Sequence, residues 1–274
     1  MLNGAQSLLV LGVAGTGKTT YMQRIVERVR ALGLRIVVIS KTHCASSRAG
    51  GCTADYFVRR HILHGACDAD VIWVDEISQI DAGIWTQLNK LTYTSVRWLL
   101  SGDFEQFPAL FNSFRGCPVA EDAFQRSNLL HRMCGGNRVT LTGCKRSDAE
   151  LFEWYASLIP GGVRFTAPLP DVIAQARRRF AFAGKARHNL VISHKRRVQL
   201  NRELNRHFAP EGSVFVRAQP QKGQLNAAQP MWLWPGIELL GCCQAEKGIR
   251  NGVLYTVESL DEEQERACLA GGLR

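Results

Sequence analysis

Five short runs of consecutive apolar residues recur along the first part of the chain, with longer polar and amphipathic segments between them. The runs lie near Ser7–Leu11, Arg35–Ser40, Val71–Val74, Val96–Leu100 and Arg138–Thr142. Continuous rather than alternating hydrophobicity is typical of strands that are covered on both faces. Because helical stretches such as Thr20 to Arg30 alternate with these runs, the pattern predicts an α/β fold with a doubly wound parallel sheet.

The pattern changes after a helix that is predicted over Asp148–Ile159. Pro160-Gly161-Gly162 follows this helix and predicts a domain junction, so we expect one domain at 1–159 and another at 160–274. Asn189–Ser193 is predicted as a strand and His194–Phe208 as a basic helix, which together begin a partial second α/β domain. Three further segments are predicted as short strands of a small β-rich, barrel-like insert: Val214–Val216, Trp232–Leu240 and Val253–Glu258.

The first apolar run leads directly into a glycine-rich segment, Gly12–Thr19. It reads G-x-x-x-x-G-K-T and has the preceding strand and following helix that a phosphate-binding loop (P-loop) requires. Its glycines let the backbone N–H groups point inward at nucleotide phosphates, beside the positive end of the helix. We expect Lys18 to reach the β- and γ-phosphates and Thr19 to bind Mg²⁺. The expected nucleotide-binding residues are Gly12, Gly15, Thr16, Gly17, Lys18, Thr19 and Thr20.

Acidic and amide side chains follow the third and fourth apolar runs. Asp75 and Glu76 come directly after Val71–Val74, where an aspartate can hold Mg²⁺ and a glutamate can deprotonate the attacking water. Gln106 can both donate to a phosphate oxygen and accept from water. The alternatives are a solvent-facing acidic pair and a plain turn after the strand. The Asp-Glu pair favours hydrolysis of the nucleotide over a phosphotransferase.

These segments together resemble superfamily 1 DNA helicases of the RecD/Pif-like group, over roughly residues 7–258. The resemblance rests on the P-loop, then Val-Asp-Glu-Ile-Ser at 74–78, then Gly-Asp-Phe-Glu-Gln-Phe-Pro at 102–108. It implies a RecA-like first domain, with Arg146 reaching the γ-phosphate across a cleft. It also implies DNA contacts by Thr42, His43 and Thr53, and 5′ to 3′ unwinding driven by ATP and Mg²⁺. The expected partner is single-stranded or forked DNA, in replication, repair or recombination.

Two features of the group are not found in the sequence. Only Met1–Gln6 precede the first strand, where the group carries an adenine-reading glutamine, and Gln6 is a poor substitute. A Ser-x-Gln-Gly-like stretch and its following arginine are not found before Arg274. We therefore expect a helicase core that is truncated at both ends. Two other classes stay open: a DNA-stimulated ATPase without unwinding activity, and a non-catalytic nucleotide-binding remnant.

Composition is consistent with a nucleic-acid partner. The 274 residues carry 34 Lys and Arg against 24 Asp and Glu, a net charge of +10, which favours polyanions. Nine cysteines, an odd number without a C-x-x-C spacing, fit a reducing intracellular compartment (nuclear, mitochondrial or viral) rather than secretion. No apolar run is long enough to span a bilayer, so no membrane partner is expected. The sequence does not determine the oligomeric state, and a monomer is the expectation.

Overall fold

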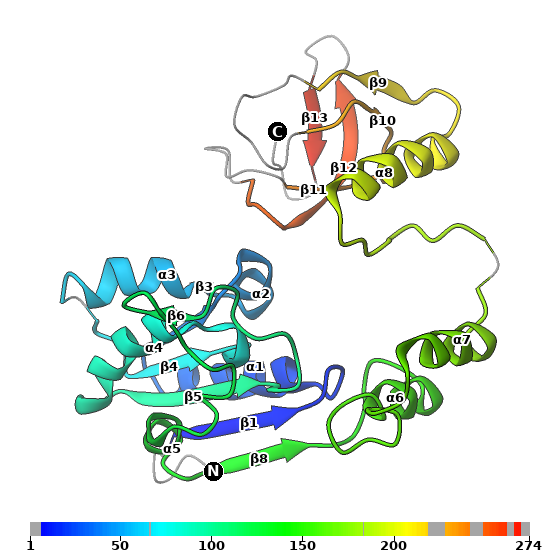
Figure 1. Cartoon of the computed structure of the whole chain (residues 1–274). Helices are drawn as coiled ribbons and strands as arrows, with labels where there is room; N and C mark the ends of the chain where they lie inside the picture. Colours follow the sequence, from blue (N-terminus) through cyan, green and yellow to red (C-terminus); the bar gives the residue numbers. More distant parts are fainter. Residues whose placement is uncertain are drawn as a thin grey trace. The chain divides into compact units, whose positions relative to one another are not determined.

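The computed structural model in Figure 1 describes residues 7–65, 67–182, 184–218, 228–241, 249–261 and 266–269. The chain forms two compact units, Met1–Val172 and Ile173–Arg274, which are described separately below. Gln6, a poor substitute for an adenine-reading glutamine, lies outside the described residues. In the described ranges, none of the helices has the length and apolar character that crossing a membrane requires.

Unit 1 is built on a parallel sheet of six strands, as the apolar runs predict. The spatial order is β3-β2-β4-β5-β1-β8, and every neighbouring pair is parallel. Strand β1 therefore has a hydrogen-bonded neighbour on each side, with Leu9 paired to Leu100 of β5 and to Arg138 of β8. The strands are β1 (Leu8–Gly12), β2 (Ile36–Ser40), β3 (Cys52–Thr53), β4 (Val71–Val74), β5 (Arg97–Gly102) and β8 (Arg138–Leu141).

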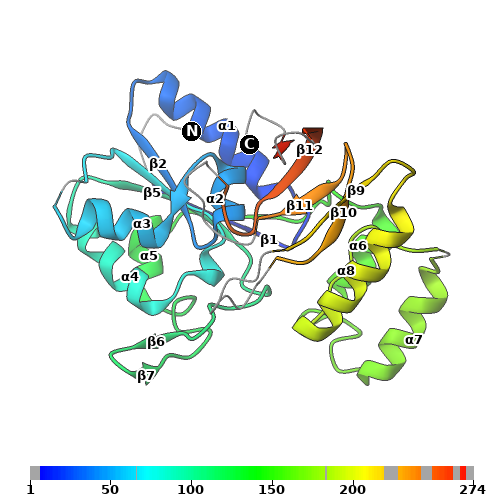
Figure 2. The ribbon, with the colours of Figure 1, turned by 90° about the horizontal axis from the view of Figure 1, so that it is seen from above.

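Helices cover both faces of this sheet, and a separate apolar cluster lies under each face. Leu9 and Val10 are both fully buried, but they belong to different clusters because strand side chains alternate between the faces. Figure 2 shows α1 on one side of the sheet and α3, α4 and α5 on the other. The helices of unit 1 are α1 (Lys18–Ala31), α2 (His43–Ala49), α3 (Ala54–Phe57), α4 (Ala82–Asn89), α5 (Asn128–Cys134) and α6 (Ala149–Ala156).

The end of unit 1 folds back on itself at the predicted junction. After Pro160-Gly161-Gly162, the amide of Arg164 donates to the carbonyl of Ser157 (2.9 Å), and its guanidinium lies 4.3 Å above the ring of Trp154. Asp148 caps α6 by accepting from the amide of Leu151 (2.7 Å). The division between the units falls later, after Val172, within helix α7 (Leu169–Arg179).

Unit 2 combines one long helix with short antiparallel strands. Helix α8 spans His194–Phe208, as predicted. The predicted strand at Asn189–Ser193 is wrong: the segment pairs with no described strand, and Leu190 and Ile192 are fully exposed. A short apolar run forms a strand only where a neighbouring strand takes up its backbone groups. The strands of the two small sheets are β9 (Val214–Val216) with β10 (Met231–Leu233), and β11 (Glu238–Leu240), β12 (Leu254–Asp261) and β13 (Arg266–Leu269).

Candidate functional site

The P-loop connects β1 to α1 and closes around its own lysine. The Lys18 amine is buried and donates to the backbone carbonyls of Gly12 (2.7 Å) and Val13 (3.3 Å). Gly17 stands at the N-cap in the left-handed region, and no side chain caps the first turn of α1. The helix therefore presents backbone N–H groups and a buried cation at one point, an arrangement that suits phosphate oxygens.

Two glycines allow strand ends to approach each other closely. A Cβ atom at Gly12 would lie 2.6 Å from the carbonyl oxygen of Leu141 on β8. A Cβ atom at Gly102, at the end of β5, would lie 2.7 Å from the side chain of Ile77 and 2.9 Å from its amide nitrogen. A larger residue at either position would push apart the segments that carry the candidate site.

Asp75 lies at the end of β4 and is almost completely buried. Its Oδ1 accepts a hydrogen bond of 2.6 Å from the Ser101 hydroxyl, and the Thr19 hydroxyl also bonds the carboxylate. Burial raises the pKa of Asp75, while Ser101, the Glu76 amide, Lys18 and Thr19 act in the opposite direction. The Thr19 hydroxyl and the Asp75 carboxylate are hard oxygen donors beside the P-loop, so they fit Mg²⁺.

Glu76 follows Asp75 in a backbone conformation that is uncommon for its residue type. Its φ of 53° and ψ of 54° lie in the left-handed region, where a residue other than glycine is strained. Its Oε2 atom is buried without a hydrogen-bond partner among the described residues. Burial raises the pKa of Glu76, and the negative charge of Asp75 raises it further. A buried carboxylate oxygen with no partner can accept a proton from a bound water molecule.

Gln106 is held in the turn that follows β5. Asp103 is buried and accepts from the backbone amide of Glu105 (3.0 Å), and its other oxygen lies 3.5 Å from the amide nitrogen of Gln106. The negative charge of Asp103 also contributes to the raised pKa of Glu76. Gln106 and Asp103 therefore belong to the surroundings of the Asp75–Glu76 pair.

The segment after β8 forms the outer wall of the P-loop. The amide of Lys145 donates to the carbonyl of Gly15 (2.8 Å), and the hydroxyl of Tyr155 donates to the carbonyl of Ala14 (2.9 Å). The positive charge of Arg146 acts to lower the pKa of Glu76. Arg146 thus belongs to the same compact unit as the P-loop and lies beside it. Sequence reasoning missed Lys145 and Tyr155, because nothing in the residue pattern indicates their contacts.

Of the three residues expected to contact DNA, Thr42 and His43 follow β2, and Thr53 is the last residue of β3. Thr42 caps α2 by accepting from the amide of Ala45 (3.2 Å), and Thr53 caps α3 by accepting from the amide of Tyr56 (3.3 Å). His43 is the first residue of α2. Both threonine hydroxyls therefore have a structural role as helix caps, in addition to any contact with a ligand.

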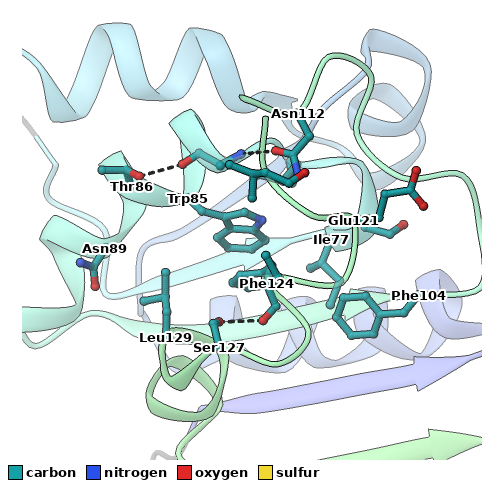
Figure 3. Close-up of a pocket in the computed structure, with 15 residues that line it drawn as sticks. Ile77, Trp85, Thr86, Asn89, Phe104, Asn112, Glu121, Phe124, Ser127 and Leu129 are labelled. Carbon is teal, nitrogen blue, oxygen red and sulfur yellow. Dashed lines mark hydrogen bonds between the residues drawn. The ribbon is translucent and has the colours of Figure 1, made fainter. Parts of the chain in front are cut away.

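A separate cavity of about 240 Å³ lies between α4 and the segment that follows β5 (Figure 3). Trp85 and Phe124 stack within it at 3.7 Å between ring centroids. A small hairpin, β6 (Ser113–Phe114) with β7 (Cys117–Pro118), lies in the same segment. None of the predicted site residues lines this cavity.

Comparisons with known proteins agree with this geometry. Residues 1–113 match the protein family described as AAA domain. The ATP-dependent DNA helicase PIF3 of Trypanosoma brucei is 27% identical over 139 residues, which cover 43% of this chain and 17% of that protein. The helicase PIF1 of the same organism is 27% identical over 115 residues, which cover 35% of this chain and 12% of that protein. The chain thus spans less than a fifth of the length of either protein.

Solved structures extend the similarity of fold to nearly the whole chain. The crystal structure of Pif1 helicase from Candida albicans has a TM-score of 0.64 at 18% identity and covers 98% of this chain and 73% of that one. The crystal structure of Bacteroides Pif1 bound to ssDNA has a TM-score of 0.58 at 17% identity and covers 97% of this chain and 70% of that one. Residues 1–113 are therefore similar to the AAA domain family, and the chain shares the RecA-like P-loop fold of the Pif1 helicase structures.

Proposed function

We propose that this chain is the ATP-hydrolysing core of a DNA helicase. The observation that carries the proposal is the meeting of the Lys18 amine, the Thr19 hydroxyl and the Asp75–Glu76 carboxylates at one edge of the sheet. Strands β4, β5, β1 and β8 are consecutive in space, so their carboxyl ends surround this point. Ligands of open α/β sheets bind at such an edge.

In this proposal the triphosphate of ATP lies along the P-loop, from Gly12 to Thr20. Lys18 leaves the carbonyls of Gly12 and Val13 and donates to the β- and γ-phosphates. Thr19 and Asp75 would hold Mg²⁺, which neutralises phosphate charge when it is bound.

Hydrolysis would use the groups around Glu76. The free Oε2 of Glu76 takes the proton from the attacking water molecule, and Gln106 orients that water. Arg146 stabilises the charge that develops on the γ-phosphate, and its electrostatic effect on Glu76 supports this position near the reacting groups.

Single-stranded or forked DNA is the proposed partner, with Thr42, His43 and Thr53 as contacts. The net charge of +10 favours a polyanion. The similar PIF3 protein is an ATP-dependent DNA helicase, and the similar Bacteroides Pif1 structure is bound to ssDNA. Unwinding in the 5′ to 3′ direction, by a monomer in an intracellular compartment, completes the proposal.

The test is to measure Mg²⁺-dependent ATP hydrolysis with and without oligo-dT, and strand separation on a 5′-tailed fork with excess ATP. DNA-stimulated hydrolysis together with ATP-dependent unwinding is the expected result. Stimulated hydrolysis without strand separation would support an ATPase that does not unwind. Tight ATP binding without turnover would instead support a non-catalytic nucleotide-binding remnant.

A further inference from the structure

Two buried hydrogen bonds connect the core of the sheet to the candidate Mg²⁺ site. The indole N–H of Trp73 donates to the Ser101 hydroxyl (2.7 Å), which in turn donates to Oδ1 of Asp75 (2.6 Å). Trp73 and Ser101 have no exposed surface, and Asp75 is 4% exposed. Both bonds are short, and the one to Asp75 has the length expected of a hydroxyl that donates to a carboxylate.

Strand pairing explains why these three side chains meet. Trp73 pairs with Leu99 and Val74 with Leu100, so Ser101 lies next to Asp75 on the neighbouring strand. Trp73 and Asp75 are two residues apart on β4 and therefore point to the same face of the sheet. Residues of two adjacent parallel strands thus form a single chain of contacts across that face.

The chemistry of the donors gives this chain one direction. An indole nitrogen can only donate, so Ser101 must accept from Trp73. A serine hydroxyl carries one hydrogen, and that hydrogen is consequently available for Asp75. Because Ser101 accepts from Trp73, its hydroxyl hydrogen points toward Oδ1 of Asp75. The hydrogen bond to Oδ1 then restricts the rotation of the carboxylate.

Burial of a tryptophan does not by itself require such a partner in this protein. The indole nitrogens of Trp85 and Trp98 are also buried, and among the described residues they have no hydrogen-bond partner. The fold therefore tolerates indoles without partners close to the same sheet. The bond from Trp73 to Ser101 is accordingly better explained by its effect on Asp75 than by the needs of the indole.

We propose that Ser101, held by Trp73, is a positioning residue that sets the orientation of the Asp75 carboxylate for Mg²⁺. This inference rests on the proposed function, in which Asp75 contacts the metal ion. Without the Ser101 hydroxyl, the carboxylate can rotate away from the Thr19 hydroxyl, and Oδ1 loses its buried donor. Groups that orient a metal ligand typically change metal affinity by about 10- to 100-fold when they are removed.

The experiment compares two pairs of matched variants. Ser101→Ala is matched by Ser40→Ala, because Ser40 is equally buried at the end of β2 and its hydroxyl has no partner among the described residues. Trp73→Phe is matched by Trp98→Phe on β5, since that indole is buried without a partner in the described structure. Binding of a fluorescent ATP analogue is titrated with Mg²⁺ and, separately, measured in EDTA, so that no turnover is needed.

Ser101→Ala should raise the half-saturating Mg²⁺ concentration by about 10-fold or more, with analogue binding in EDTA unchanged. Trp73→Phe should raise it by a smaller factor, because Ser101 can still donate, while both control variants should match the parent. An indole N–H resonance that is lost in Trp73→Phe should move on addition of Mg²⁺ and ATP in the parent, but not in Ser101→Ala.

A parental Mg²⁺ requirement in folded Ser101→Ala would overturn the inference while the nucleotide site stands. If Ser101→Ala does not fold, equal Mg²⁺ requirements of Trp73→Phe and Trp98→Phe would overturn it instead. A parent protein that binds the analogue with no dependence on Mg²⁺ would overturn the proposed function, and this inference with it.

Discussion

The hydroxyl of Tyr155 on helix α6 donates a hydrogen bond of 2.9 Å to the backbone carbonyl of Ala14, 141 positions earlier in the chain. The amide of Lys145 bonds the next carbonyl, that of Gly15 (2.8 Å). These two bonds hold the outer side of the P-loop, whereas the Lys18 amine fills its inner side. The shape of the loop therefore depends on a helix that the P-loop sequence pattern does not include.

Tyr155→Phe should weaken ATP binding without abolishing it. A hydrogen bond of this kind contributes about 0.5–1.5 kcal/mol, so we expect the dissociation constant to rise by roughly 2- to 10-fold. Calorimetric titration with ATP and Mg²⁺ measures the change. Tyr93→Phe is the matched control, because the ring of Tyr93 is 75% exposed and its side chain contacts Arg132. Equal affinity of Tyr155→Phe and the parent would show that the loop holds its shape without this bond.

Lys18→Ala should abolish binding of ATP and Mg²⁺. The Lys18 amine is the buried cation of the loop, and charge-assisted bonds to phosphate are strong. Filter binding or calorimetry checks this expectation. Lys90→Ala removes an exposed lysine at the end of α4 and should bind like the parent. Retained nucleotide affinity in Lys18→Ala would contradict the assignment of the P-loop.

Glu76→Gln should separate binding from hydrolysis. The substitution keeps the size of the side chain but removes the base, so turnover should fall by roughly 100-fold or more while ATP still binds. Steady-state phosphate release and analogue binding are measured together. Glu105→Gln changes an exposed glutamate in the nearby turn and should leave turnover unaltered. Parental turnover in Glu76→Gln would exclude Glu76 as the general base.

Thr42→Asp combined with Thr53→Asp should weaken DNA binding with little change in ATP affinity. Aspartate is also a good N-cap residue, so both helices keep their caps while a negative charge opposes phosphate. Oligo-dT binding is measured over a salt series. A plot of log K against the logarithm of the salt concentration should have a slope of about −0.7 for each phosphate contact. Ser127→Asp at the N-cap of α5 is the matched control. Unchanged DNA affinity in the double variant would show that Thr42 and Thr53 do not contact DNA.

Lys41→Met should lower the free energy of unfolding at neutral pH. It should also make that free energy depend less on pH under acidic conditions. Lys41 bonds Asp81 (2.7 Å) and Asp55 (3.0 Å). Burial acts to raise the pKa of Asp81, but the hydrogen bonds from Lys41 and the Ile84 amide outweigh it and hold that pKa below its ordinary value. A lowered carboxyl pKa stabilises the fold above the unfolded-state value, about pH 4, and this contribution disappears as the pH falls through the lower folded-state value.

Urea unfolding at pH 7 and pH 3 measures this difference. Because both side chains are partly exposed, we expect Lys41→Met to cost about 1 kcal/mol or less at pH 7, and less at pH 3. Lys90→Met, at an exposed position, should change neither value. An equal cost of Lys41→Met at both pH values would show that the ion pairs do not supply the stability.

The parallel sheet could be predicted because strands that are buried on both faces leave continuous apolar runs, and the structure confirms this sheet. The P-loop could be predicted because its glycine spacing combines with a strand and a helix in a fixed order. The left-handed conformation of Glu76 could not, since no residue pattern indicates it and glutamate rarely adopts it. The contact of Tyr155 with the loop also depends on tertiary packing. The prediction of a strand at Asn189–Ser193 is wrong because apolar character alone does not supply a pairing partner.

The place of β1 inside the sheet and of β8 at its edge determines how the nucleotide site would open. Among the described strands, β8 is bonded only to β1, and most of its side chains are exposed, so its amides should exchange with solvent before those of β1. If β8 separated from β1, Leu141 would lose its contact with Gly12. The hydrogen bond from the Lys145 amide to the Gly15 carbonyl would be lost as well. Bound nucleotide would oppose this local opening, because a ligand stabilises the closed form that binds it. Slower hydrogen exchange of the β8 amides should therefore be the first sign that nucleotide occupies the site.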